Sequence, residues 1–346
     1  MAESPLARAL LEWFSGAARA MPWRGQSDPY KIWISEIMLQ QTRISAATGY
    51  YLRFIDALPD VRALAEAPEE RLLKLWEGLG YYSRARNLQR AARMVIERFD
   101  GRMPQTAAAL RELPGVGEYT AGAVASIAFG ERVPAVDGNV LRVMTRLLND
   151  DRDITRPQTR RAVAEAVLHE QPPERPGDFN QALMELGALV CLPRRPRCGE
   201  CPISALCQAR KGNKQALLPV KKAAAPRKAE ERTVLVLCAG GCTALRRRPP
   251  RGLLAGLWEF PSCAGHLGEA EALAQARQWG LSPLNIAPLP GHRHVFTHRE
   301  WVMRGFVITA ADCAGPFVWA SRERLESDMA LPSAMQAFQR QAEGWM

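Results

Sequence analysis

The spacing of apolar residues divides this 346-residue chain into two parts. Up to about residue 207 the apolar residues recur at helical spacing, as in Leu6, Leu10, Trp13 and Phe14, and turn signals such as Ala67-Pro68 separate the segments. Farther along, residues 233–238 and 301–308 are typical of strands and residues 268–279 of a helix. The first part is therefore predicted to be all-α and the second to be a smaller α+β domain.

The segment between these parts has its own composition. Residues 211–232 contain seven Lys or Arg, two acids and an Ala-Ala-Ala-Pro break, without an apolar period. This pattern is typical of a solvated linker, and its charge would also let it lie along a phosphate backbone. We expect one domain at residues 1–210, a basic linker at 211–232 and a second domain at 233–346.

Composition narrows the class of partner. The chain is 47% hydrophobic with a net charge of +10, so a polyanion is the natural partner, although charge alone leaves nucleic acid and an acidic membrane surface both open. There is no run of 18 apolar residues, and residues 1–16 lack the features of a secretory signal. Eight cysteines, half of them in one loop, fit a reducing compartment better than a disulfide scaffold. We expect an intracellular protein with no membrane segment.

Half of the cysteines share one short loop. Cys191, Cys198, Cys201 and Cys207 follow the spacing Cys-x6-Cys-x2-Cys-x5-Cys. Structural zinc sites usually use two close pairs far apart in sequence, whereas four thiolates in one compact loop are typical of a [4Fe-4S] cluster. The alternative is four cysteines that cluster without a metal. We expect one [4Fe-4S] cluster, in a loop that also presents cations, namely Arg194, Arg195, Arg197 and Arg210.

A glycine-containing turn precedes an apolar helix in the first part. Leu113-Pro-Gly-Val-Gly117, followed by residues 119–129, has the form of a helix-hairpin-helix at residues 113–130. Gly115 and Gly117 permit a tight turn whose backbone N–H groups could hold a DNA phosphate without reading sequence. The alternative is an ordinary turn between two helices.

Two carboxylates stand out by their surroundings. Ser27-Asp28-Pro29 starts a predicted helix that runs to Thr42, with Trp33, Glu36 and Gln40 on one face. Apolar surroundings can raise the pKa of a glutamate such as Glu36 until it serves as a general acid. The alternative is a residue at the rim of a half-buried helix. Asp137 precedes a helix and could act only as its N-cap, yet the adjoining Gly138-Asn139 would let a base or sugar approach.

Several motifs occur together in one order. They are Ser-Glu-Ile-Met-Leu-Gln-Gln-Thr around Glu36, Gly78-Leu-Gly-Tyr-Tyr-Ser-Arg-Ala-Arg-Asn87, the Leu-Pro-Gly-Val-Gly hairpin, Val-Asp-Gly-Asn around Asp137 and the four-cysteine loop. In this order they resemble the adenine DNA glycosylases of the MutY type, within the endonuclease III superfamily. The resemblance implies a six-helix barrel module beside a [4Fe-4S] module, with double-stranded DNA as partner.

Tyr119 decides which chemistry the resemblance implies. Bifunctional members carry a lysine two residues after the last glycine of the hairpin, and tyrosine cannot form the Schiff base that this lysine makes. The resemblance therefore implies monofunctional hydrolysis of the N-glycosidic bond of a flipped adenine, with Glu36 as general acid and Asp137 stabilising the oxocarbenium ion. Tyr119 and Asn139 would contact Asp137 or the sugar.

Further roles follow from family position. The adenine pocket would be lined by Arg19, Trp23, Arg24, Leu39 and Glu185, with Glu185 accepting from the exocyclic amine. Contacts near the opposite base are expected from Gln41, Thr42 and Tyr81. Generic candidates for phosphate contacts are Arg84, Arg86 and Arg146.

The second domain resembles a Nudix fold without its chemistry. Residues 247–261 look like the start of that fold, but Leu273, Ala274, Arg277 and Gln278 stand where the magnesium-binding acids should be. In MutY-type enzymes this domain recognises 8-oxoguanine opposite the adenine through a Phe-Ser-His loop, for which this chain has Phe296, Thr297 and His298. Threonine keeps the hydroxyl. The nearby His292 and His294 lack a clear fourth ligand for zinc.

The sequence leaves three classes of function open. The favoured one is a bacterial, cytoplasmic, nucleoid-associated monomer that removes adenine opposite 8-oxoguanine or guanine. The second is an endonuclease III-like glycosylase and abasic-site lyase for another base. The third is a DNA-binding scaffold, against which the presence of both Glu36 and Asp137 argues.

Overall fold

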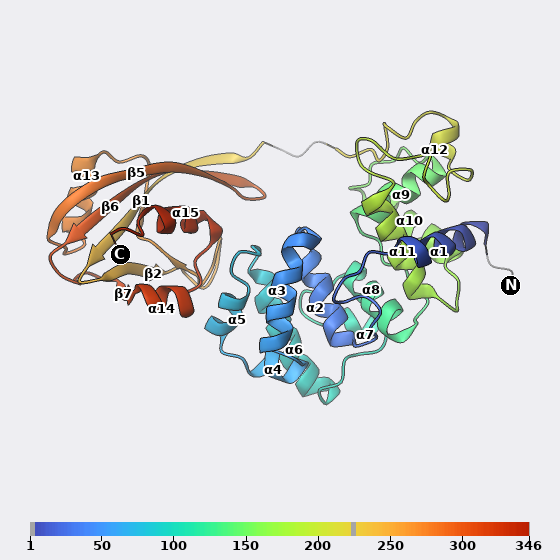
Figure 1. Cartoon of the computed structure of the whole chain (residues 1–346), viewed down its shortest axis with the longest axis horizontal. Coiled ribbons are helices and arrows are strands. Elements are labelled where there is room, and N and C mark those ends of the chain that lie inside the picture. The colour runs from blue at the N-terminus through green and yellow to red at the C-terminus, as the bar shows by residue number, and fades with distance from the viewer. Residues whose placement is uncertain (1–3, 223–225, 346) are drawn as a thin grey trace. The chain divides into compact units, whose positions relative to one another are not determined.

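The computed structural model describes residues 4–222 and 226–345, which form two compact units (Figure 1). The first unit contains residues 4–66 and 86–222, and the second contains residues 67–85 and 226–345. The second unit therefore includes a short stretch of the helical half of the sequence together with the α+β part.

All regular secondary structure in the described residues of the first unit is helical. Its helices are α1 (Pro5–Ala17), α2 (Pro29–Leu39), α3 (Ile44–Ala57), α4 (Val61–Glu66), α6 (Ser83–Phe99, which begins in the second unit), α7 (Ala107–Leu110), α8 (Glu118–Phe129), α9 (Gly138–Leu148), α10 (Pro157–Glu170), α11 (Pro176–Leu189) and α12 (Gln208–Lys211). Helix α5 (Glu69–Leu75) belongs to the second unit. The prediction of an all-α first part is confirmed.

Local sequence explains where these helices begin and end. Ser4 and Asp28 cap α1 and α2, since Ser4 Oγ accepts from the backbone N–H of Ala7 and Asp28 Oδ1 from that of Tyr30, both at 3.0 Å. A proline follows each cap, where its missing N–H costs no hydrogen bond. Helix α9 ends at Asn149, which adopts the left-handed conformation that asparagine tolerates.

One apolar core of the first unit lies among α1, α9, α10 and α11. Leu6, Leu10 and Phe14 are buried in it, as their helical spacing predicts, whereas Trp13 is only partly buried. Three of the loop cysteines, Cys191, Cys201 and Cys207, pack against the same core. The four-cysteine loop is therefore seated on the helices that also carry Asp137 and Glu185.

Helix α2 packs against α3 and α8 and is buried on almost its whole circumference. The spacing of Trp33, Glu36 and Gln40 predicts a single buried stripe and a helix that continues to Thr42, and this prediction is wrong. The helix ends at Leu39, and residues 40–42 form the turn that follows. A helix buried on all sides has apolar residues on every face, so their spacing marks neither a stripe nor an end.

The second unit is built on a seven-stranded sheet with the order β3-β2-β1-β6-β5, in which β4 pairs with β1 and β7 with β2. Its elements are β1 (Lys228–Ala239), β2 (Cys242–Arg247), β3 (Trp258–Glu259), β4 (Ser262–Ala264), α13 (Glu269–Gln278), β5 (Pro283–Val295), β6 (Arg299–Ala310), β7 (Val318–Ser321), α14 (Arg322–Ser327) and α15 (Ser333–Gln341). Helix α13 packs on one apolar core and α14 and α15 on another. The α+β prediction is confirmed.

Strand β1 begins at Lys228, inside the segment that composition predicts to be a linker. Residues 228–232 pair in parallel register with residues 299–303 of β6. Backbone hydrogen bonding to a neighbouring strand extends β1 without any apolar alternation, so the side-chain pattern marks only the part of the strand that is buried.

No helix among residues 4–222 and 226–345 combines the length and the apolar character needed to cross a membrane.

A substitution at Gly122 can test how closely α8 packs against the backbone at Pro134. A Cβ atom at this buried position would fall on the carbonyl oxygen of Pro134, whereas one at Gly16, in the exposed last turn of α1, would meet nothing. Gly122→Ala should therefore lower the free energy of unfolding by about 1–3 kcal/mol. Gly16→Ala, the matched control, should raise it by roughly 0.5–1 kcal/mol. Thermal unfolding followed by circular dichroism measures both, and equal midpoints for the two variants would contradict the close packing.

Candidate active site and cluster loop

One cavity of the first unit, about 640 Å³ in volume, brings together side chains that lie far apart in the sequence. Its volume is in the range of pockets that hold small organic ligands. The residues that sequence reasoning placed in the chemistry or the adenine pocket all line it, together with two of the predicted opposite-base contacts: Arg19, Trp23, Arg24, Glu36, Leu39, Gln41, Thr42, Tyr119, Asp137, Asn139 and Glu185. Sequence reasoning missed other lining residues, among them Gln40, Arg160, Gln181 and Met184.

Glu36 lies on α2 and is only 7% exposed. Burial raises the pKa of its carboxyl to about 7, and the nearby Asp137 adds to this rise. A hydrogen bond from Tyr119 and the charge of Arg24 act in the opposite direction without reversing it. Glu36 can therefore hold a proton near neutral pH, as a general acid must.

Tyr119, in the first turn of α8, faces Glu36. Its hydroxyl donates to Glu36 Oε2 at 2.5 Å and also lies 3.5 Å from Met184 Sδ. Burial raises the pKa of Tyr119 well above its ordinary value, so the hydroxyl keeps its proton. The hydrogen bond occupies Oε2 and leaves Oε1 as the oxygen of Glu36 that can face a ligand.

Asp137 is the N-cap of α9, as its place before the helix predicts. Its Oδ1 accepts from the backbone N–H of Val140 at 2.7 Å, and its Oδ2 accepts from Asn139 Nδ2 at 2.8 Å. Burial raises the pKa of Asp137 above its ordinary value, although these hydrogen bonds favour the charged form. Capping and a place in the cavity are compatible, because the capping hydrogen bonds hold the carboxyl at the cavity wall.

Arg142 connects this corner of the cavity to the cysteine loop, and sequence reasoning missed it. Its Nη2 donates to Asn139 Oδ1 at 2.9 Å and to the carbonyl of Gly187 at 2.8 Å, and its Nε donates to the carbonyl of Cys191 at 2.8 Å. The chain of contacts therefore runs from Asp137 through Asn139 and Arg142 to the first loop cysteine. Arg142 lies three residues after Asn139 on the same face of α9, and this spacing could have indicated its role from the sequence.

Glu185 on α11 is 3% exposed and is surrounded by arginines. Its Oε1 accepts from the backbone N–H and Nε of Arg19, at 3.1 and 2.6 Å, and its Oε2 accepts from Arg19 Nη2 and Arg24 Nη2, at 2.9 and 3.1 Å. Burial opposes the charge, but these donors outweigh it and hold the pKa of Glu185 below its ordinary value. The four contacts use the acceptor capacity of the carboxylate, so Glu185 orders the two arginines.

Some N–H donors of Arg24 are not used by Glu185. It donates only Nη2 to Glu185, while its Nε and Nη1 are buried and, among the described residues, have no hydrogen-bond partner. Buried donors without partners are costly, and they are usually satisfied by water or by a ligand. Arg24 lines the cavity, but these two atoms are closed off from it and the guanidinium lies 5.0 Å from the centroid of the Phe14 ring, so a ligand would reach them only if the Arg24 side chain moved.

The hairpin expected to bind phosphate is present between α7 and α8. Gly115 has a φ of +79°, and a Cβ atom there would lie 2.6 Å from the Cβ of Asn87. Only glycine meets both conditions without strain. Gly117 is the N-cap of α8, so its turn opens at the positive end of a helix.

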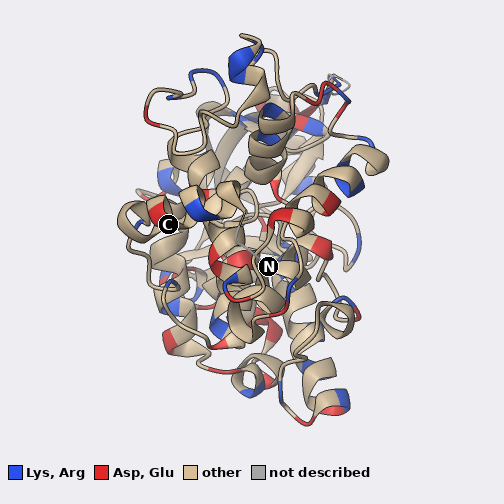
Figure 2. Cartoon of the chain, turned by 90° about the vertical axis from the view of Figure 1, so that its right-hand side faces the viewer, with Lys and Arg blue, Asp and Glu red and all other residues tan. Residues whose placement is uncertain are grey.

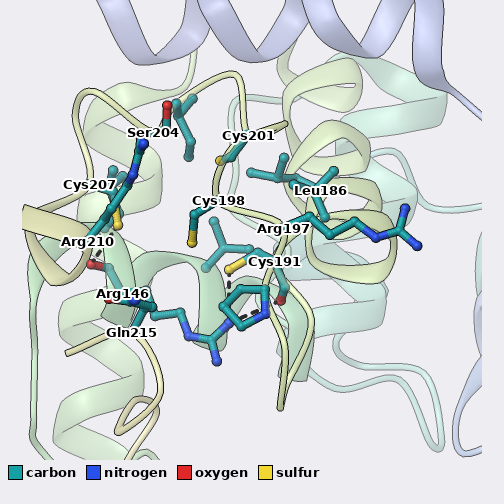
Figure 3. A pocket seen from close by; sticks show the side chains of 15 residues that line it. Arg146, Leu186, Cys191, Arg197, Cys198, Cys201, Ser204, Cys207, Arg210 and Gln215 are labelled. Carbon is teal, nitrogen blue, oxygen red and sulfur yellow. Dashed lines mark hydrogen bonds between the residues drawn. The ribbon is translucent and has the colours of Figure 1, made fainter. Parts of the chain in front are cut away.

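The four loop cysteines line a second cavity of the first unit, which Figure 3 shows from close by. Burial, with a smaller contribution from the neighbouring thiols, raises the pKa of Cys201 to about 11. Among the described residues, no three His, Cys, Asp or Glu side chains are grouped closely enough for one metal ion. Four thiols from one short loop that line one cavity fit the ligand set of a [4Fe-4S] cluster.

Arg146 is a correction, because sequence reasoning named it as a generic candidate for a phosphate contact. It is 1% exposed and holds the cysteine loop from inside: its Nη1 lies 3.3 Å from Cys191 Sγ and donates to the carbonyl of Leu192 at 2.7 Å, and its Nη2 donates to that of Pro193 at 2.9 Å. Its Nε donates to the carbonyl of Leu218 at 2.9 Å. The cations that the loop does expose are Arg194, Arg195, Arg197 and Arg210.

The remaining predicted contacts lie in the second unit. Thr297 is exposed at the tip of the β5–β6 hairpin, and its hydroxyl is 3.0 Å from that of Tyr81. Phe296 packs on Trp301 and His294 with ring centroids 4.9 and 4.6 Å apart. Arg84, a suggested phosphate contact, instead donates to the carbonyls of residues 79 and 80.

Three segments of the chain match known families. Residues 34–168 match the HhH-GPD superfamily of base excision DNA repair proteins, residues 191–207 the iron-sulfur binding domain of endonuclease III, and residues 232–341 the NUDIX domain. The predicted order of a hairpin-containing domain, a cluster loop and a Nudix-like domain is thereby confirmed. The cluster is a [4Fe-4S] centre, and the ligands that fit it are Cys191, Cys198, Cys201 and Cys207.

Whole-chain relatives agree with these matches. The adenine DNA glycosylases of Homo sapiens and Rattus norvegicus are 37% and 38% identical to this chain. Each alignment covers 84% of this chain, and 64% and 68% of the two relatives. The chain thus spans about two-thirds of their length.

Solved structures resemble the helical part. A thermostable thymine-DNA glycosylase has a TM-score of 0.56 and 31% identity, over 60% of this chain and 95% of its own. A non-covalent complex of endonuclease III with DNA has a TM-score of 0.51 and 25% identity, over 62% and 98%.

Glu36 should make stability depend on pH. Because its folded-state pKa is raised from 4.5 to about 7, its contribution is complete below pH 4.5 and is lost as the pH rises through 7. Relative to wild type, Glu36→Gln should therefore gain about 3 kcal/mol of unfolding free energy between these limits. Urea unfolding on both sides of neutrality measures this, and Glu118→Gln, which removes an exposed carboxylate, is the control. Parallel pH profiles for wild type and Glu36→Gln would refute the raised pKa.

Proposed function

This chain belongs to the family of adenine DNA glycosylases, and from this we propose that it removes adenine from double-stranded DNA when the base opposite is 8-oxoguanine or guanine. The observation that carries the proposal is the buried Glu36 carboxyl, with a pKa raised to about 7, beside Asp137 in a cavity of about 640 Å³. A protonated acid next to a second carboxylate suits the breaking of a bond between a base and a sugar.

The proposed reaction begins with an adenine flipped into the cavity. Glu36 donates its proton to N7 of the base, and the electrons of the glycosidic bond leave with the base. The sugar becomes an oxocarbenium ion, which the Asp137 carboxylate stabilises. A water molecule then adds its oxygen to C1′ of the sugar, and its proton returns to a cavity carboxylate. Tyr119 has no amine for a Schiff base, so the strand is not cut.

Arg24 is proposed to bind the adenine more directly than Glu185. Adenine offers ring nitrogens as acceptors, and Arg24 has two buried donors without partners among the described residues, which a movement of its side chain would expose to the base. The acceptor positions of Glu185 are already used by arginines. We therefore assign Glu185 the task of orienting Arg24, and the exocyclic amine would have to displace one of these hydrogen bonds to reach it.

The DNA strand is proposed to be held without reading its sequence. The turn at Gly115 and Gly117 would bind a backbone phosphate at the start of α8. Figure 2 shows Lys and Arg segments interspersed with Asp and Glu segments along the ribbon. Positioning on DNA would then rest on local contacts such as this turn and the cations of the cluster loop.

The opposite base is proposed to be recognised by exposed turns. Gln41 and Tyr81 have φ values of +60° and +47°, which non-glycine residues adopt only where the surrounding structure enforces them. Tyr81 is 46% exposed, so its ring can fill the space left by flipping. We propose that Phe296, Thr297 and His298 contact 8-oxoguanine, and that the chain is organised functionally as a catalytic domain (1–210), a linker (211–232) and a recognition domain (233–346).

The proposal predicts a pattern of substrates. In single-turnover reactions the full chain with its cluster should release adenine opposite 8-oxoguanine or guanine, and should leave thymine opposite guanine and thymine glycol intact. Abasic product should break only after alkali. Release of an oxidised pyrimidine, or strand cutting without alkali, would instead favour an endonuclease III-like lyase.

Glu36 should control the rate of excision. Glu36→Gln should reduce release of adenine by about 10²–10⁴-fold, because it removes the general acid, while duplex affinity stays within a few-fold of wild type. In the wild type the single-turnover rate should fall as the pH rises through about 7, where Glu36 loses its proton. Rate profiles from pH 5.5 to 8.5 measure this, and unchanged excision by the variant would remove Glu36 from the acid role.

A further inference from the structure

Three arginines of the second unit converge on one buried carboxylate. Glu259 is 2% exposed, and its Oε1 and Oε2 accept from Arg246 Nε at 2.9 Å and Arg248 Nη1 at 2.5 Å. Arg232 lies beside them, and its Nη1 donates to Ser262 Oγ at 3.3 Å. Arg246 Nη2 donates to the carbonyl of Ser262, also at 3.3 Å. This set, Arg232, Arg246 and Arg248 around Glu259, is called the arginine cluster below.

Trp301 forms the floor of the arginine cluster. Its ring is 1% exposed, with the guanidinium of Arg232 4.3 Å and that of Arg248 5.6 Å from its centroid. The same ring packs against Phe296 of the hairpin tip, with centroids 4.9 Å apart. The arginine cluster therefore lies directly beside the tip that is proposed to contact the opposite base.

Positive charge at the cluster exceeds what the protein neutralises. The acids that act electrostatically on Arg232 are Glu259 and Glu230, and the cations are Arg246 and Arg248. Glu230 is already engaged by Arg299, at 2.9 Å, and by Trp301 Nε1, at 3.1 Å. Four arginines thus share two carboxylates. Burial lowers the pKa of Arg232, which shows that its charge is only partly compensated.

The arginines also have unused donors. The contacts of Arg232 employ Nη1, those of Arg246 employ Nε and Nη2, and those of Arg248 employ Nε and Nη1. In the described part of the chain, Arg232 Nε and Nη2, Arg246 Nη1 and Arg248 Nη2 have no protein partner, and they are not among the buried atoms that lack one. These N–H groups therefore reach solvent from three sides of one site.

An ion network that served only stability would have a different composition. One cation suffices to neutralise Glu259, and each additional half-buried cation costs desolvation free energy. Convergent guanidinium donors with excess positive charge are instead typical of phosphate recognition. The positions expected to carry magnesium ligands hold Leu273, Ala274, Arg277 and Gln278, so a phosphate here would be bound and not hydrolysed.

We propose that the arginine cluster binds a backbone phosphate of the DNA strand whose base meets the hairpin tip. The identity of this occupant rests on the proposed function, whereas the phosphate chemistry rests on the cluster alone. A phosphodiester carries one negative charge, so it would neutralise half of the excess charge of these arginines and accept from their unused donors without displacing Glu259. The contact would fix the recognition unit on the strand while the tip reads the base.

Arg232→Met is the informative substitution, because it leaves both hydrogen-bonded partners of Glu259 in place and keeps an apolar stem over Trp301. Arg304→Met is the matched control, since Arg304 is exposed on β6 of the same sheet and its loss removes the same charge. Arg232→Lys retains the charge. Each full-length, cluster-loaded variant would be titrated by fluorescence anisotropy with a duplex that carries a stable tetrahydrofuran abasic site opposite 8-oxoguanine, over a range of KCl concentrations.

One phosphate contact contributes about 0.9 to the slope of log affinity against log salt. Arg232→Met should reduce this slope by about 0.9 and weaken duplex binding roughly tenfold at about 50 mM KCl. Arg304→Met and Arg232→Lys should keep most of the slope and of the duplex affinity. An equal effect of Arg232→Met and Arg304→Met would overturn the proposal. If Arg232→Met does not fold, Arg232→Gln takes its place in the same titration, and a slope and affinity equal to those of Arg304→Met would likewise overturn the proposal.

Two further measurements distinguish a DNA phosphate from a free phosphate as the ligand, and the phosphate site from the proposed function. Pyrophosphate and a nucleoside 5′-monophosphate, titrated calorimetrically, test for a free-phosphate site, and tight binding of either that Arg232→Met abolishes without changing duplex affinity would contradict a DNA contact. The same anisotropy series on a duplex with guanine opposite the abasic site does not depend on 8-oxoguanine recognition. If wild type releases no adenine in the single-turnover reactions while the slope still falls in Arg232→Met, the proposed function fails and the phosphate site stands.

Discussion

The proposed chemistry of this protein depends on keeping one carboxyl group away from water. Glu36 lies on a helix buried on nearly all sides, and Tyr119 donates to one of its oxygens at 2.5 Å. Burial alone would only favour a neutral acid of undefined orientation. The hydroxyl of Tyr119 fixes one oxygen, so the proton of Glu36 is directed into the cavity. The close packing of α8, including the contact at Gly122, places Tyr119 and thereby sets this geometry.

Helix α9 carries the second carboxyl and connects it to the cluster loop. Asp137 caps the helix, and Asn139, Arg142 and Arg146 follow at intervals that bring them to one side of it. Arg142 reaches the carbonyl of Cys191, and Arg146 reaches its sulfur. A loop that folds around a cluster therefore holds the far end of a hydrogen-bonded path to Asp137. Through this path the fold of the cluster loop influences where the Asp137 carboxyl lies.

The second unit applies the same physical means to recognition. Its sheet extends a long β5–β6 hairpin whose tip rests on Trp301, and three arginines surround the same ring. Aromatic packing makes the tip rigid, and the unbalanced charge beside it attracts an anion. Without metal-binding carboxylates, this Nudix-like fold is proposed to provide a surface that binds and does not cleave. In the proposed function the first unit supplies the chemistry and the second the discrimination between opposite bases.

The sequence by itself determined the fold classes, the cluster cysteines, the hairpin and both carboxylates, because each depends on spacing along the chain or on a residue type that few alternatives can replace. It also indicated that Asp137 caps a helix. It did not determine the end of α2, the start of β1, the buried position of Arg146, the occupied acceptors of Glu185 or the unused donors of Arg24. Those features depend on which side chains meet across α2, α8, α9 and α11, or on which strands pair. Burial, pKa shifts and the use of hydrogen-bond donors and acceptors depend on such tertiary contacts, so only the tertiary structure decided them.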